Sequence, residues 1–117
     1  MFSVRNAALW MLVAAAGTAE AVTPGDQAGA EQLAVAGVSS LELCQEKNPT
    51  WGLTLEGMLS DPSFNDERKA EFRKVSSDPH YKGDIAAMRA FYLDPGIVDT
   101  LPRMCAGIRK MDKSAQQ

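Results

Sequence analysis

The side chains with the greatest capacity for chemistry are two cysteines, Cys44 and Cys105, and a single histidine, His80. A catalytic thiol needs a neighbouring base, most often a histidine. His80 instead follows the Asp78-Pro79 step, in the expected first turn of a helix, and neither cysteine has a histidine near it in the sequence. We therefore interpret His80 as a surface residue and predict a Cys44–Cys105 disulfide. A hydrolase built around His80 and the nearby acids is the alternative.

Metal and phosphate chemistry are not indicated by the sequence. A zinc site needs three or four nitrogen or sulfur ligands, and apart from the cysteines the chain has one histidine. It contains no phosphate-binding Gly-rich loop, no Gly-x-Ser-x-Gly motif and no Cys-x-x-Cys-His motif. The acidic residues 61–67 lack the spacing of a calcium-binding loop. We expect no catalytic residue, no metal and no cofactor, and hence a protein that is not an enzyme.

The N-terminus has the pattern of a secretory signal peptide. Arg5 provides a positive charge, an apolar run extends from Ala7 to Ala16, and small residues at Ala19 and Ala21 fit a cleavage site. The apolar run is about half as long as the ~20 residues of a membrane span. We expect cleavage after Ala21, a secreted protein and no span in the mature chain. The periplasm or an organelle lumen is the alternative location.

Length and charge restrict the function classes further. The chain has 117 residues, which is enough for one small domain, and a net charge of −3. Because nucleic-acid-binding proteins are usually basic, we expect no nucleic-acid partner. Export to an oxidising compartment favours pairing of the two cysteines. A bond between Cys44 and Cys105 would close a loop of about 61 residues. By restricting the unfolded chain it would stabilise the folded protein by roughly 4 kcal/mol.

Four Asn-Pro and Asp-Pro steps divide the chain into short helices. Asn or Asp caps the free backbone N–H groups of a helix, and Pro fits its first position. We expect a first helix over about 30–47, further helices beginning at the first three of these steps, and a turn at Asp94-Pro95. Thr100 is expected to cap the last helix. The four steps are Asn48-Pro49, Asp61-Pro62, Asp78-Pro79 and Asp94-Pro95.

The predicted fold is all-α, a small irregular bundle of four or five short helices with one disulfide linking the first and last helix. No run of alternating β-branched residues indicates a strand. We expect a signal peptide over 1–21, a flexible leader over 22–30, a helical domain over 31–113 and a disordered tail over 114–117. Gly37 weakens the first helix or marks the close approach of a neighbour. Leu53 lies off the apolar face expected for the second helix.

Met and aromatic side chains provide the candidates for a binding site. Such side chains line adaptable apolar pockets, although they also fill ordinary cores. In the fourth helix we expect an apolar stripe of Tyr81, Ile85, Met88 and Tyr92, with Phe91 alongside. Tentative ligand-binding residues, for each of which a core role is the alternative, are Trp51, Leu55, Leu59, Tyr81, Met88 and Phe91.

Three segments resemble the elicitins, small secreted helical proteins of oomycetes. Residues 51–65 (WGLTLEGMLSDPSFN) are similar to the elicitin helix that ends in a Leu-Ser-Asp-x-Ser-Phe-Asn turn. Residues 77–81 (SDPHY) are similar to the Asp-Ser-Gly-Tyr turn, and residues 101–107 (LPRMCAG) to the Met-Cys-Ala-Ser step. Together they cover about half of the expected mature chain. Elicitins have six cysteines, whereas this chain has two.

The resemblance implies a secreted carrier or effector that binds a sterol or a fatty acid. Its helices would surround an apolar pocket formed by the tentative ligand-binding residues. The alternative is a secreted or periplasmic protein-binding module, such as a small chaperone or an accessory subunit, that holds a partner on an exposed apolar helix face. We expect a monomer in either case.

Overall fold

The computed structural model describes residues 24–116, with side chains from 29 to 115. The expected signal peptide therefore lies outside the described residues. Every regular element in the described part is helical and none is a strand, which confirms the all-α prediction. The elements are α2 (Pro24–Lys47), the 3-10 turn η1 (Pro49–Trp51), α3 (Leu55–Leu59), α4 (Asp66–Ser77), η2 (Pro79–Tyr81), α5 (Lys82–Tyr92), η3 (Val98–Thr100), α6 (Leu101–Met111) and η4 (Lys113–Gln116).

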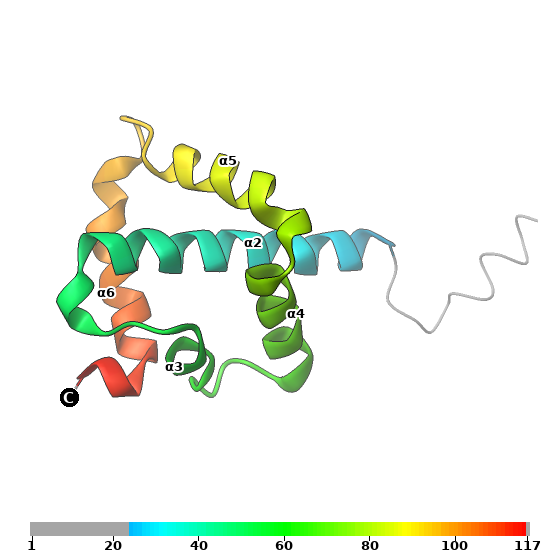
Figure 1. The fold of residues 1–117 in the computed structure, drawn as a ribbon, viewed down its shortest axis with the longest axis horizontal. Coiled ribbons are helices and arrows are strands. Elements are labelled where there is room, and N and C mark those ends of the chain that lie inside the picture. Colours follow the sequence, from blue (N-terminus) through cyan, green and yellow to red (C-terminus); the bar gives the residue numbers. More distant parts are fainter. Residues whose placement is uncertain (1–23, 117) are drawn as a thin grey trace, which may run out of the picture.

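Helix α2 is the axis of the fold. It contacts α4, α5 and α6, whereas the short helix α3 packs against α6 and η4. Figure 1 shows α2 running between α5 on one side and α3 on the other. One face of this helix is buried, including Ala34, Val38 and Leu41. No helix in the described part is long and apolar enough to cross a membrane.

The predicted disulfide joins α2 to α6. Cys44 and Cys105 are bonded, their Cα atoms are 5.4 Å apart, and both residues are buried. The bridge spans 61 positions of the sequence and fixes the C-terminal part of α2 against the last α-helix. The link between the first and last helices is thus confirmed.

Gly37 marks the close approach of α4 to α2, as one of its two interpretations predicted. A Cβ atom at this position would lie 2.3 Å from Cε2 of Phe72. The buried Phe72 ring therefore rests directly on the α2 backbone. Phe64 packs edge-on against it, with ring centroids 5.1 Å apart.

The first helix starts earlier than predicted. α2 begins at Pro24, so most of the segment expected to be a flexible leader is helical. Proline in the first turn lacks only an N–H that would have no helical partner, and its fixed φ suits a helix start. A glycine inside a helix costs only about 1 kcal/mol relative to alanine, which is too little to prevent a helix. Gly25 and Gly29 were therefore weak grounds for predicting a flexible leader.

The Asn48-Pro49 step starts a single 3-10 turn, so the prediction of a helix from this point was wrong. Gly52 adopts a left-handed backbone with φ of 69° and ends the turn. The α-helix α3 begins later, where the Thr54 side chain accepts a 2.9 Å hydrogen bond from the Gly57 N–H. Leu53 lies between them in a non-helical segment and is buried.

The Asp61-Pro62 step forms a turn, so the predicted start of the third helix was also wrong. The Asp61 carboxylate accepts hydrogen bonds from the N–H and hydroxyl of Ser63 within this turn. Helix α4 is capped instead by Asn65, whose Oδ1 accepts from the Arg68 N–H at 2.7 Å.

The Asp78-Pro79 step starts a helical segment as predicted. The Asp78 carboxylate accepts from the His80 N–H at 2.9 Å. His80 itself is exposed, so the interpretation of this histidine as a surface residue is confirmed. Thr100 is the N-cap residue of α6, as predicted, but its side chain makes no capping hydrogen bond, because its hydroxyl donates to the Ile97 carbonyl at 2.8 Å.

The C-terminal segment, for which a disordered tail was predicted over 114–117, forms the 3-10 turn η4 through Gln116. The Asp112 carboxylate accepts from the Ser114 N–H and hydroxyl, at 3.1 and 2.6 Å, and folds the chain back after α6. Ala115 is buried as a result. Gln117 lies outside the described residues.

Candidate functional site: a groove between α2 and α5

An open groove of about 670 Å³ lies between α2 and α5. Its α5 wall consists of residues spaced i, i+3, i+4 and i+7, which share one face of a helix. Its α2 wall consists of Glu31, Gln32 and Val35, which lie within about one turn of that helix. Tyr81 of η2 also lines the groove. We call this the α2–α5 groove, and its lining residues are Glu31, Gln32, Val35, Tyr81, Asp84, Ala87, Met88 and Phe91.

The floor of the groove is continuous with the protein core. Val35 and Tyr81 are buried core residues, and Met88 is half-buried against that core. Phe91 stands at the open side with 53% of its surface exposed. Full burial of an exposed phenylalanine side chain is worth about 1.5–3 kcal/mol, and covering the exposed half of this ring would contribute part of that.

One end of the groove is polar and already hydrogen-bonded. The Tyr81 hydroxyl donates to Glu31 at 2.7 Å, and Lys74 Nζ lies 3.6 Å from the same carboxylate. The hydrogen bond to the Glu31 anion is the main reason why the pKa of Tyr81 is raised above its ordinary value. Tyr81 therefore remains a neutral hydrogen-bond donor and is not suited to act as a base or nucleophile.

Three of the six tentative ligand-binding residues line the groove: Tyr81, Met88 and Phe91. The other three belong to a different part of the fold. Trp51 lies in η1, with the Arg109 guanidinium 4.5 Å from its ring centre. Leu55 and Leu59 belong to α3, and Leu59 is fully buried in the core.

The six residues therefore do not form the single pocket that the resemblance implied. α3 packs against α6 and η4, whereas α5 packs against α2. The helices expected to face each other across a ligand are thus not each other's main packing partners, although Leu59 and Tyr81 belong to the same hydrophobic core. A structural core role, the alternative given for each residue, fits Leu59 directly.

The α2 wall and the acidic residues of the groove were not predicted. Asp84, Ala87, Met88 and Phe91 show helical spacing, but the stripe chosen from the sequence followed Tyr81 and Ile85. The helical spacing of Ala87, Met88 and Phe91 could have indicated a second apolar face beside that stripe. The contribution of α2 depends on how α5 is placed across it, which no local pattern specifies.

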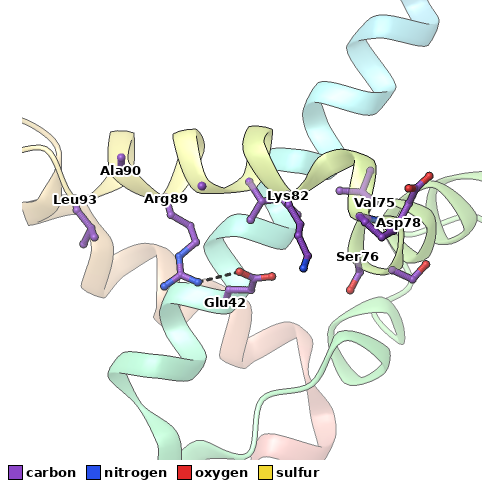
Figure 2. A pocket seen from close by; sticks show the side chains of 12 residues that line it. Glu42, Val75, Ser76, Asp78, Lys82, Arg89, Ala90 and Leu93 are labelled. Carbon is purple, nitrogen blue, oxygen red and sulfur yellow. Dashed lines mark hydrogen bonds and ion pairs between the residues drawn. The ribbon is translucent and has the colours of Figure 1, made fainter.

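A second pocket of about 580 Å³ lies on the opposite flank of α5. Figure 2 shows Lys82 and Arg89 projecting from α5 toward Glu42 of α2. Arg89 bonds Glu42 at 2.9 Å and also pairs with Glu46. Its pKa is raised, first through the Glu46 hydrogen bond and then through the one to Glu42. The two acids compensate the charge of Arg89, and these ion pairs tie α5 to α2 across the pocket.

A smaller cleft of about 350 Å³ separates α2, α4 and α6. Phe72 and Met58 are buried there, and Met104 and Met111 are partly buried against the core. Its lining includes the exposed Leu33, but most of its other apolar side chains are buried or partly buried in the core.

No group of three or more His, Cys, Asp or Glu side chains in the described part could hold a metal ion. The lining of the α2–α5 groove is an apolar surface with an acidic border, formed by Glu31 and Asp84, and it is suited to binding. Comparison of the chain with protein-family models, with curated proteins and with solved structures finds no match.

Proposed function

We propose that this chain is an exported binding protein whose α2–α5 groove holds apolar side chains of a protein partner. One observation carries the proposal. Phe91 is 53% exposed at the open side of a groove whose floor is formed by buried core residues. Exposed apolar surface continuous with a cavity is typical of an interaction site.

An extended partner fits this groove better than an enclosed lipid. Small-molecule sites usually bury most of the surface of their ligand. Here Trp51, Leu55 and Leu59, which were expected to complete an enclosure, do not line the groove. The open side leaves Phe91 accessible to a segment that continues beyond the groove. Binding of a sterol or fatty acid, implied by the elicitin resemblance, stays a prediction and is one outcome of the experiment below.

Export supports the same proposal. The buried Cys44–Cys105 disulfide is typical of an oxidising compartment. The sequence pattern of residues 1–21 is that of a secretory signal. A partner is therefore sought among exported proteins.

The matched pair Phe91→Ser and Leu93→Ser tests the proposal. Leu93 is 42% exposed and lies near Phe91 in sequence, but it lines the second pocket. The exported fraction of the native host is passed over each immobilised variant, and bound protein is quantified. We expect a stoichiometric partner on wild type and on Leu93→Ser. Its recovery should fall by about tenfold or more on Phe91→Ser, the size expected of a central aromatic contact.

Equal recovery on wild type and Phe91→Ser would contradict the proposal. Native mass spectrometry of the same preparations adds the second readout. A lipid that copurifies with wild type and is lost from Phe91→Ser would assign the groove to a small apolar molecule instead. Circular dichroism spectra of the three proteins should superimpose, because both substituted side chains are exposed.

A further inference from the structure

The shape of the α2–α5 groove indicates the form of its occupant. The groove is bounded by two helices that lie beside each other (Figure 1), and its α5 wall is the single face formed by Asp84, Ala87, Met88 and Phe91. From Asp84 to Phe91 this face spans about two helical turns, or roughly 10 Å. A third helix laid between two others presents its own side chains with the same periodicity.

The charges of the groove are one-sided. Its described lining residues include two acids, Glu31 and Asp84, and no lysine or arginine. Glu31 is engaged by the Tyr81 hydroxyl and by Lys74. Asp84, in contrast, takes part in no ion pair in the described part of the chain, and its neighbour Lys82 lines the second pocket, as Figure 2 shows.

The position of Asp84 also has a local explanation, since an acid in the first turn of α5 interacts favourably with the helix dipole. That interaction does not supply a counter-charge. When an apolar partner covers the groove, Asp84 loses part of its water shell. A positive side chain of the partner would compensate this loss, and a negative one would add repulsion.

We propose that the occupant is an amphipathic α-helix of a partner protein, with apolar side chains over Met88 and Phe91 and a lysine or arginine opposite Asp84. This inference rests on the proposed function and adds the chemistry and the polarity of the partner. The basic residue lies about two turns from the apolar residue that contacts Phe91, which also sets the direction of the bound helix.

Three synthetic peptides provide the probe. All are amphipathic helices of about four turns with the same leucine stripe, and they differ only in one flanking residue near the stripe, which is Lys, Gln or Glu. Affinity for the full chain is measured by titration calorimetry at low and high salt. Wild type should bind the Lys peptide about fivefold tighter than the Glu peptide, the scale of one partly exposed charge contact. Added salt should reduce this preference.

Two variants separate the inference from the proposed function. Asp84→Asn should retain binding of the Gln peptide and lose the preference for Lys. Ala87→Gln, which fills an exposed position of the groove without removing a core side chain, and Phe91→Ser should weaken all three peptides alike.

Equal binding of the Lys and Glu peptides to wild type, with a loss on Phe91→Ser, would overturn the inference and leave the proposed function standing. Binding of all three peptides that does not depend on Phe91, or no binding of any peptide to wild type, would overturn the helical occupant altogether. The pull-down with Phe91→Ser then decides separately whether the groove binds a partner of another form.

Discussion

At the scale of single residues, Asp112 is the polar group on which the C-terminal part depends most. Its carboxylate is fully buried and accepts from the Thr54 N–H at 3.0 Å and the Ala115 N–H at 3.1 Å, besides the two groups of Ser114. A Cβ atom at Gly57 would lie 2.2 Å from its Oδ1, so only glycine allows α3 to approach it. One side chain thereby joins the start of α3, the end of α6 and η4.

Asp112→Asn should destabilise the protein by about 1–3 kcal/mol, because an amide cannot accept from every donor that now faces the carboxylate. Burial raises the pKa of Asp112, but hydrogen bonds from Ser114 and from the backbone of Thr54, Ala115 and Ser114 outweigh it, so the net shift is downward. A lowered pKa means that this stability is present above the unfolded pKa of about 4 and is lost as the pH falls through the folded value.

Urea unfolding at pH 7 and at about pH 3 to 4 measures both effects, since the unfolded pKa of Asp lies in this range. Wild type should lose stability over this interval, and Asp112→Asn should lose less. The exposed Asp99 provides the control, because Asp99→Asn should follow wild type at each pH. An unchanged pH dependence in Asp112→Asn would assign the acid sensitivity to other carboxylates, such as Asp61, whose pKa is also lowered, chiefly by its hydrogen bonds from Ser63.

At the scale of elements, apolar spacing was a better guide than helix-start motifs. The apolar residues Val38, Leu41 and Cys44 have the spacing of one helix face, and that face of α2 is buried and carries the bridge to Cys105. The Asn-Pro and Asp-Pro steps were less decisive, since the same dipeptide starts a helix or closes a turn. The carboxylate hydrogen bond does not distinguish the two outcomes, because Asp61 and Asp78 each accept from the N–H two residues later in the chain.

The groove was only half predictable for a related reason. Met88 and Phe91 lie on one helix, so their proximity follows from local periodicity. Val35 joins them only because α5 crosses α2 at a particular place, which is set by the packing of the whole core. The six tentative residues were grouped through the elicitin resemblance, and the observed helix contacts do not bring them together.

The contact between α2 and α4 can be tested with two glycines of the same helix. Gly37→Ala would place a Cβ 2.3 Å from the buried Phe72 ring, whereas Gly29→Ala meets nothing within 4 Å. We expect Gly37→Ala to cost about 1–3 kcal/mol through overpacking. Gly29→Ala should leave stability unchanged or raise it by up to about 1 kcal/mol through helix propensity. Urea midpoints of the two variants measure the difference, and equal midpoints would mean that the Phe72 ring yields without cost.

At the scale of the whole molecule, two connections hold α6 and η4 in place. The disulfide ties α6 to α2, and Asp112 ties the segment after α6 to the start of α3. The α2–α5 groove depends on neither directly, because its walls are α2 and α5. Loss of the bridge should therefore lower global stability before it alters the groove.

The double substitution Cys44→Ala/Cys105→Ala tests this separation. Opening a loop closed over 61 positions should cost up to roughly 4 kcal/mol, because the unfolded chain regains its freedom. The urea midpoint should fall accordingly. Below the new transition, peptide affinity at the groove should match that of wild type, since Val35 and Phe91 keep their neighbours. Because both cysteines are buried, a mild reductant should act on the wild-type bridge only when denaturant is also present. A reduced affinity in the folded double variant would show instead that the bridge holds α2 in the position that the groove requires.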